Sequence, residues 1–235
     1  MKKISFALVL CFYASTTMAA RVLGKEEITR LQKSFKSNSE MSVDFTQTQT
    51  KKLRGKSRTS LGKAYFKNPN LFRWQLLTPQ KDEWIYDGKN LYNFIPDQNQ
   101  AYKYEAKGSK GRELRQIIEL VTHYSTLSES YDFGEVIEES NVQGSSQGTT
   151  QGTTKGTVEN KTTNIDVIIH LKPKQRGELS GVVLRLQKSS SEPKSLILTF
   201  ANGNETKLEF SNINYKDLSE STFSIPLSVK IETVK

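Results

Sequence analysis

Aromatic residues recur at alternate positions over much of the segment from Gly62 to Tyr104. In an extended strand, residues two positions apart point to the same side, so each such pair lies on one face of a sheet. Asp87-Gly88 falls between two of these runs and predicts a tight two-residue hairpin turn. The segment is therefore expected to form a meander of antiparallel strands with one aromatic face, which must be covered by a core, a lid or a ligand. Its aromatic residues are Tyr65, Phe66, Phe72, Trp74, Trp84, Tyr86, Tyr92, Phe94, Tyr102 and Tyr104.

The pattern on either side of this segment adds helices and further strands. Apolar residues at helical spacing predict one amphipathic helix from about Glu26 to Lys36 and a second from about Gly111 to Tyr124. Strands are expected at 41–50 and again from Ile165 onward, with a second tight hairpin at Asn202-Gly203. Nothing resembles parallel βαβ units. The predicted fold class is therefore α+β, an incomplete antiparallel β-barrel (a strongly curved sheet) closed by two or more helices.

Three polar segments border these elements. Residues 51–59 are rich in Lys, Arg and Gly and predict a basic hairpin tip. The run from Glu135 to Glu139 is interpreted as the charged edge of a strand. In the tract at about 141–157, Gln-Gly recurs at positions 143, 147 and 151, each time followed by two Ser or Thr residues. Such a tract buries too little apolar surface to offset its ordering entropy, so a flexible low-complexity loop is expected there.

Residues 1–20 have the features of a cleaved secretory signal peptide. The dipeptide Lys2-Lys3 precedes an apolar stretch at 4–14, and small residues at 17–20 form a cleavage site. The apolar stretch is too short to span a bilayer. Cys11 is the only cysteine, and the residue before it is not small, which argues against a lipid anchor. Residues 21–235 are expected to form a single exported, soluble domain without thiol or disulfide.

Charge and candidate chemistry narrow the function classes. Removing Lys2 and Lys3 from the 34 basic residues leaves 32 against 25 acidic ones, a net charge of +7. This is interpreted as a solvated basic surface or as attraction to anionic membranes or acidic partners. No nucleic-acid recognition motif is present. The only histidines are His123 and His170, and there is no Gly-x-Ser-x-Gly, so neither catalysis nor a metal or cofactor is predicted.

Three short motifs follow one another in the first half of the chain. They are Val43-Asp44-Phe45-Thr46-Gln47, then Lys67-Asn68-Pro69-Asn70-Leu71-Phe72-Arg73-Trp74, then Trp84-Ile85-Tyr86-Asp87-Gly88. In their order and spacing they resemble the corresponding strands of the LolA-type periplasmic carriers of outer-membrane lipoproteins. The resemblance is close over roughly Ile28 to Tyr104, loose afterwards, and faint again at 222–229.

The resemblance implies a periplasmic carrier that shields lipoprotein acyl chains between a concave apolar sheet face and a helical lid. The implied partners are acylated lipoproteins, an inner-membrane lipoprotein-releasing ABC transporter and an outer-membrane lipoprotein receptor, with the carrier acting as a monomer. By the same resemblance, the residues facing the acyl chains would be Leu31, Phe45, Phe72, Trp74, Trp84, Tyr86, Ile117 and Val121.

One position departs from the family pattern. Where the family usually has an arginine that hydrogen-bonds the lid helices of the closed, empty carrier, this chain has Asn68. Because Asn68 is shorter and uncharged, the resemblance implies a lid held more loosely or by other contacts. Two alternatives stay open: a periplasmic half-barrel sensor or regulatory module, and a general lipid or glycolipid shuttle.

Overall fold

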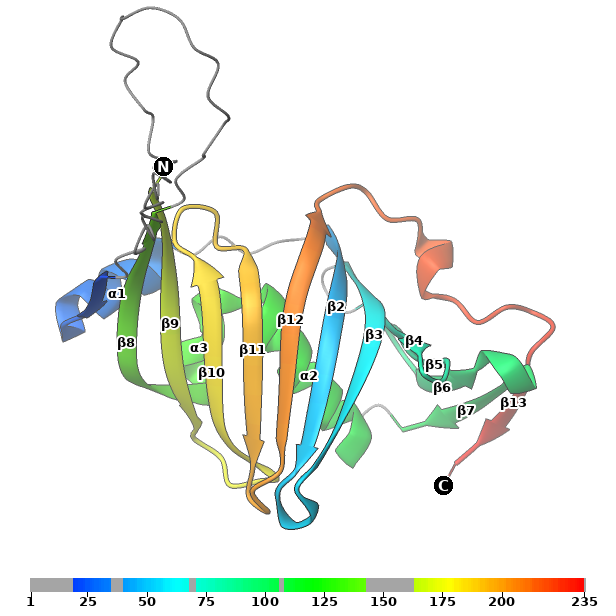
Figure 1. The fold of residues 1–235 in the computed structure, drawn as a ribbon. Coiled ribbons are helices and arrows are strands. Elements are labelled where there is room, and N and C mark those ends of the chain that lie inside the picture. Colours follow the sequence, from blue (N-terminus) through cyan, green and yellow to red (C-terminus); the bar gives the residue numbers. More distant parts are fainter. Residues whose placement is uncertain (1–18, 35–39, 68–70, 106–107, 143–162, 235) are drawn as a thin grey trace, which may run out of the picture.

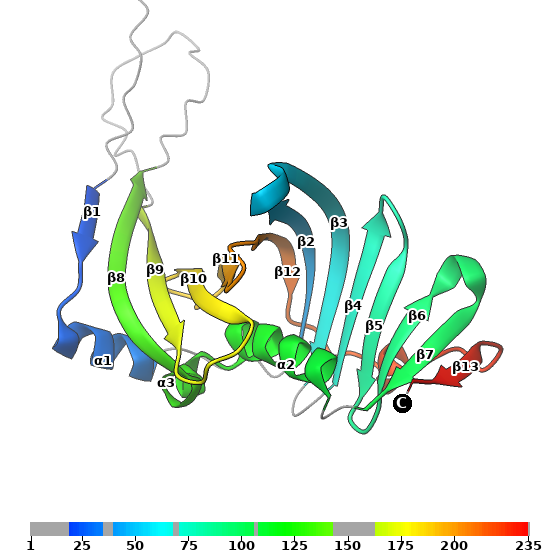
Figure 2. The ribbon, with the colours of Figure 1, turned by 90° about the horizontal axis from the view of Figure 1, so that it is seen from below.

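The computed structural model describes residues 19–34, 40–67, 71–105, 108–142 and 163–234. In these residues the strands form one 13-stranded sheet, antiparallel throughout except for the parallel pair β7–β13. The sheet curves strongly and stays open, because its first and last strands do not pair with each other (Figures 1 and 2). The strongly curved, incomplete antiparallel barrel expected from the sequence is therefore confirmed.

The strand order is β1-β8-β9-β10-β11-β12-β2-β3-β4-β5-β6-β7-β13. Hairpins connect β2 to β7 in one run and β8 to β12 in another, and the pairing of β12 with β2 joins the two runs into one sheet. The strands are β1 (Ala19–Val22), β2 (Glu40–Lys51), β3 (Lys56–Lys67), β4 (Leu71–Thr78), β5 (Asp82–Asp87), β6 (Leu91–Ile95), β7 (Gln100–Tyr104), β8 (Tyr131–Val142), β9 (Thr163–Pro173), β10 (Leu179–Gln187), β11 (Pro193–Phe200), β12 (Glu205–Asn214) and β13 (Lys230–Thr233).

Three α-helices lie on the concave side of the sheet or beside its β8 end. They are α1 (Lys25–Ser34), α2 (Ser109–Thr122) and α3 (Leu127–Ser130), with the short 3-10 turn η3 (Tyr124–Thr126) between the last two. Seen along the strands, α2 crosses the open side of the arch from the β8–β10 arm toward the β2–β5 arm (Figure 2). Both predicted helices are confirmed, although α2 ends at Thr122 and Tyr124 belongs to the turn that follows.

The concave side holds the main hydrophobic core. Along β2, Met41, Val43, Phe45 and Gln47 are buried while the residues between them are half-buried, which is the period of two expected for a sheet with one covered face. A second, smaller cluster of Ile85, Phe94, Ala101 and Val229 lies on the outer face of β5–β7. The turn η4 (Glu220–Phe223) contacts β4 and β5 on that outer face.

The three predicted hairpins are present, but the residues that form each loop differ from those predicted. At the first, the Asp87 N–H donates to the Asn90 carbonyl, and Gly88 has φ +88°, so the two central residues are Gly88-Lys89, one position later than expected. At the second, the Gly203 N–H donates to the Phe200 carbonyl, giving a three-residue loop with Gly203 in the left-handed region. The basic hairpin tip is shorter than 51–59, because β2 and β3 extend into it and leave only the 3-10 turn η1 (Lys52–Arg54) and Gly55.

The interpretation of Glu135–Glu139 as a sheet edge is wrong. Residues 19–22 form β1 and pair with β8, so β8 lies inside the sheet. Glu138 then forms ion pairs with Arg21 at 3.2 Å and with Lys188 at 2.6 Å. Glu139 pairs with Arg185 at 2.9 Å. Two of the three glutamates in the run are therefore neutralised by basic residues of β1, of β10 and of the turn after β10. The signal peptide and the loop expected at about 141–157 lie almost wholly outside the described residues.

Candidate functional site

Strand register decides which aromatic residues share the concave face. Phe72 lies opposite Tyr86, and Trp74 lies opposite Trp84, on neighbouring strands β4 and β5. Residues that face each other across an antiparallel pair point to the same side. The ring centroids of Phe72 and Tyr86 are 6.1 Å apart, and those of Trp84 and Tyr104 are 5.5 Å apart. These pairs form the aromatic face that the sequence predicts.

One aromatic pair lies on the other side. Tyr92 is opposite Ile85, and Phe94 is opposite Ala101, so both aromatic residues of β6 point to the outer face. Phe94 belongs to the small outer cluster rather than to the concave core. The expectation of a single aromatic face for the whole segment is therefore wrong for these two residues. The spacing of a pair shows that its members share a side, but only the pairing with neighbouring strands shows which side it is.

Phe45 and Trp74 form the closest aromatic contact of the concave face. Their rings are stacked with centroids 4.0 Å apart. Between them in the sheet lies Gly62, which is opposite Phe45 in the register of β2 and β3. A Cβ atom at Gly62 would overlap the Phe45 ring and the Gln75 carbonyl oxygen. Gly62 is thus required for the stack, a role the sequence analysis missed because a lone glycine in a strand gives no direct signal.

The structure brings together the other residues that the resemblance assigns to the acyl chains. Leu31 of α1 and Val121 of α2 are buried in the same hydrophobic core as Phe45, Phe72 and Trp74. Ile117 of α2 and the aromatic pair of β5 are partly buried against it. Asn68 lies outside the described residues. Side chains of helix α2 and of the aromatic face thus belong to one hydrophobic core.

A polar hollow of about 510 Å³ opens where the aromatic face ends, toward the β2–β3 hairpin. Gln47 follows Phe45 on the same side of β2, and Leu76 follows Trp74 on the same side of β4, so the hollow continues the concave face. Its charged residues are of both signs, and Lys81 pairs with Asp97 at 3.6 Å. The lining residues are Gln47, Gln49, Arg58, Ser60, Leu76, Gln80, Lys81, Asp82, Ile95, Asp97 and Gln98.

The end of α2 carries a titratable group in an apolar setting. Burial raises the pKa of Glu119 above its ordinary value, although a hydrogen bond with Ser130 and the nearby His123 act in the opposite direction. His123 follows the helix, and its Nδ1 lies 2.6 Å from the Thr122 hydroxyl oxygen. Burial also raises the pKa of the Tyr131 hydroxyl. The neutral form of each buried acid is therefore favoured beside α2.

The outer face of β4 is fastened to the C-terminal segment. Arg73 lies between Phe72 and Trp74 and therefore points away from the aromatic face. Its Nε donates to Glu83 at 2.9 Å. Its Nη1 donates to the Thr222 carbonyl at 3.0 Å. At the end of the neighbouring strand β3, Lys67 donates to the Leu218 carbonyl at 2.8 Å. The outer residues of the resembling motif therefore hold residues that lie about 150 positions later in the chain.

Together these features define an α+β half-barrel whose concave aromatic face shares one hydrophobic core with a crossing helix. A family model described as "Outer membrane lipoprotein carrier protein LolA" matches residues 36–146. The resemblance inferred from the three motifs is thereby confirmed over this part of the chain. The matched residues hold β2 to β7, α2 and the whole aromatic face.

Comparisons with individual proteins agree with the family match. An outer-membrane lipoprotein carrier protein of Actinobacillus pleuropneumoniae is 32% identical over 97 residues, which cover 41% of this chain and 45% of the relative. The protein of the same description from Sodalis glossinidius is 29% identical over 101 residues, covering 43% and 49%. The chain thus spans about half the length of the relatives it matches.

Among solved structures, an uncharacterized conserved protein from Thermus thermophilus has a TM-score of 0.50 at 12% identity. The match covers 89% of this chain and 98% of the other. At this level of identity the similarity supports the fold alone. In the described part of the chain, no helix is long and apolar enough to cross a membrane. Those same residues contain no group of three or more His, Cys, Asp or Glu side chains placed to hold a metal ion.

Proposed function

We propose that this protein is a periplasmic carrier that shields the acyl chains of lipoproteins on its concave aromatic face, beneath helix α2. The observation that carries the proposal is that α2 crosses the concave side of the sheet and shares one hydrophobic core with that face. Val121 has no exposed surface, and Phe72 and Trp74 opposite the helices are 2% and 7% exposed. Acyl chains need an apolar surface that water does not reach, and this face belongs to the larger of the two hydrophobic clusters in the described residues.

The apolar face supplies enough driving force for cargo without a catalytic group. Each methylene moved from water into an apolar site contributes about 0.8 kcal/mol, so a single acyl chain outweighs the cost of ordering several side chains. Aromatic rings suit this task because they offer large apolar surfaces with few rotatable bonds. Binding and transfer, rather than catalysis, therefore form the activity we propose.

Helix α2 has the properties of a movable cover. The main-chain hydrogen bonds of a helix are internal, so α2 can leave the sheet without breaking the strand ladder. Its described apolar residues belong to the core or are packed against it, and residues 105–108 and 123–126 connect it to β7 and α3. Cargo would replace these side-chain contacts with acyl contacts of similar chemistry. Opening and closing would then cost little beyond the exchange of one apolar surface for another.

A carrier of this kind has no energy source of its own, so the proteins that load and unload it must set the direction of transport. We propose that an inner-membrane ABC transporter loads the protein and that an outer-membrane receptor with a more apolar site unloads it. The names of the matched relatives support lipoproteins as the cargo class. A shuttle for lipids or glycolipids without a protein part is the second candidate, because the polar hollow beside the aromatic face could accept a polar headgroup.

Native cargo identifies the function directly. The exported chain would be purified without detergent, and any bound molecules would be extracted and analysed by mass spectrometry. Proteins that begin with an acylated cysteine are expected. Phospholipid or glycolipid alone would favour the second candidate. A protein that carries nothing, and that fails to take up a fluorescent acylated peptide in solution, would refute the carrier proposal.

A further inference from the structure

The β2–β3 hairpin ends in an exposed tip whose chemistry the carrier function does not use. From Lys51 to Arg58 every residue is exposed, and the leucine at its end, Leu53, is 93% exposed. Leu53 is set apart from other exposed apolar residues by its place at the end of a turn among cations. Five of the eight residues are cationic, and none is acidic.

The tip cations are not neutralised within the described fold. The ion pairs found among the described residues include none of Lys51, Lys52, Arg54, Lys56 and Arg58. Glu205 lies opposite Thr50 in the pairing of β12 with β2, and it forms no described ion pair with the tip either. The positive charge of the tip is thus available to an external partner.

The tip is held in place rather than free to collapse. Gly55 closes the turn with φ +57°, and its N–H donates to the Lys52 carbonyl. The Lys52 N–H donates to the Asn204 side chain at 3.3 Å, and the Lys52 stem lies against Gly203, where a Cβ atom would be 2.8 Å from Lys52 Cδ. Two adjacent hairpins therefore brace the turn and direct Leu53 outward.

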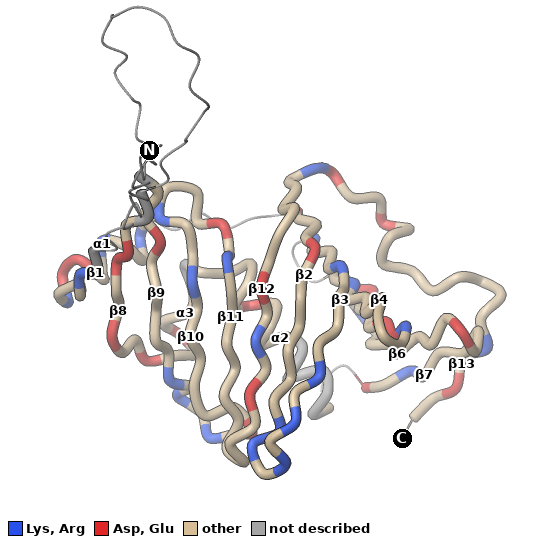
Figure 3. The backbone as a smooth tube through the Cα atoms, viewed as in Figure 1, with Lys and Arg blue, Asp and Glu red and all other residues tan. Residues whose placement is uncertain are grey.

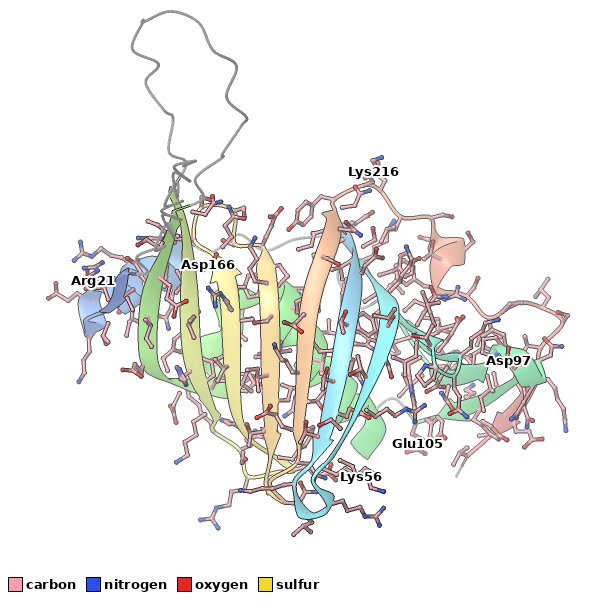
Figure 4. The ribbon with its side chains drawn as sticks, in the orientation of Figure 1. Arg21, Lys56, Asp97, Glu105, Asp166 and Lys216 are labelled. Atoms are coloured by element: carbon pink, nitrogen blue, oxygen red, sulfur yellow. The ribbon has the colours of Figure 1, made fainter. Side chains whose placement is uncertain are left out.

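Other basic residues lie at the same end of the molecule. The β9–β10 connection lies at this end together with the tip and the β11–β12 turn (Figure 1). Blue segments gather there in Figure 3, and Lys172 at the end of β9 and Lys174 and Arg176 of the connection are exposed. In Figure 4, Lys56 marks this end and Lys216 the opposite end. The basic surface is thus wider than one hairpin.

We infer that this end of the protein, with Leu53 at its centre, docks transiently on an anionic lipid bilayer. A protruding apolar side chain ringed by cations is the arrangement that binds lipid headgroups and inserts into the interface between them. Arg58 belongs both to the tip strand and to the polar hollow, where it donates to Gln80 at 3.2 Å. Docking would therefore bring the hollow next to the membrane. This inference rests on the proposed carrier function and identifies the end of the molecule at which cargo would be exchanged.

The test is flotation of the full mature chain, without cargo, on vesicles of phosphatidylcholine alone or mixed with phosphatidylglycerol. Binding is expected only to the anionic vesicles and should weaken with added salt. Leu53→Ser should reduce partitioning by about tenfold. The triple variant Lys51→Gln, Arg54→Gln, Lys56→Gln should reduce it by about a hundredfold, since each cation near an anionic surface contributes roughly fivefold. Lys52 and Arg58 are left intact because they contact neighbouring turns.

Matched controls use the same chemistry elsewhere on the surface. Leu227 is fully exposed, and Lys89, Lys194 and Lys216 are exposed cations away from the tip. Leu227→Ser and the three Lys→Gln changes should leave partitioning within about twofold of the wild type. Equal losses in tip and control variants, or a wild type that binds neither kind of vesicle, would overturn the inference. Uptake of a fluorescent acylated peptide in solution, measured for every variant, separates this failure from failure of the carrier proposal.

Discussion

Phe72→Glu distinguishes a carrier face from an ordinary core. Phe72 is 2% exposed, and its ring lies 6.1 Å from that of Tyr86 on the next strand. The substitution places a carboxyl group among apolar side chains, where no described basic residue belongs to the cluster. The size of the resulting stability loss depends on whether water can reach position 72 after α2 moves.

A permanent core and a face that α2 can uncover predict different losses of stability for Phe72→Glu. In a permanently closed core, loss of the ring costs about 3–5 kcal/mol. Desolvation of the carboxyl group adds at least about 1–3 kcal/mol. Together these approach the whole stability of a typical domain, about 5–15 kcal/mol, so the protein would unfold. If α2 can leave the face, the carboxyl group becomes hydrated, and the loss is limited to the free energy of moving α2. The protein then stays folded but no longer holds acyl chains.

Phe94→Glu is the matched control. Phe94 is also buried, at 7% exposed, but it belongs to the outer cluster that the carrier proposal does not involve. Stability would be measured by urea unfolding followed by circular dichroism, and cargo binding by uptake of a fluorescent acylated peptide. We expect Phe72→Glu to fold and fail in uptake, and Phe94→Glu to lose more stability. Normal uptake by folded Phe72→Glu would refute the assignment of this face to cargo, and an unfolded protein would show it to be a permanent core.

Four further perturbations test other parts of the reasoning. Arg73→Ala should lower stability by about 1–3 kcal/mol, because its partner Glu83 is only 10% exposed and loses its counter-charge. It should also make the C-terminal segment more susceptible to limited proteolysis, because the bond of Arg73 to the Thr222 carbonyl is lost. An unchanged cleavage pattern would contradict this role of Arg73. Since burial raises the pKa of Glu119 in the folded state, the contribution of this group to stability is complete below its unfolded pKa and is lost as the pH rises through the folded value. Glu119→Gln should therefore have a higher melting temperature than the wild type at neutral pH and a similar one in acid, and the opposite order would exclude this effect. Deleting Gln143–Gly156 should change the melting temperature and cargo uptake little, because the strand ends on either side already pair and closure entropy varies by only about 0.6 kcal/mol per doubling of loop length; a large loss in either measurement would assign the tract a structural or partner role. Asn68→Arg should lower cargo affinity and favour release by holding the empty lid closed, and equal access of an apolar dye to both proteins would show that this position does not control the lid.

Local pattern in the sequence was enough to determine the fold class. The alternation in β2, the helical spacing of Leu31, Ile117 and Val121, and the two glycine-containing turns each depend on residues close together in the chain. Periods of two and of 3.6 residues describe which positions share a side, and each of these predictions was confirmed in kind. The motifs around Phe45, Phe72 and Trp84 also carried the family resemblance, because those strands lie close together in the chain and their spacing is visible in the sequence.

Only the tertiary structure decided questions that depend on distant strands. Tyr92 and Phe94 have the same spacing as Phe72 and Trp74, yet they face outward because of their register with β5 and β7. Glu138 lies inside the sheet because residues 19–22 pair with β8, an approach of segments more than a hundred positions apart that no local pattern records. Gly62 is required by the packing of Phe45 beneath a neighbouring strand. In each case the deciding interaction joins residues through space, so its free energy depends on partners that the local sequence does not specify.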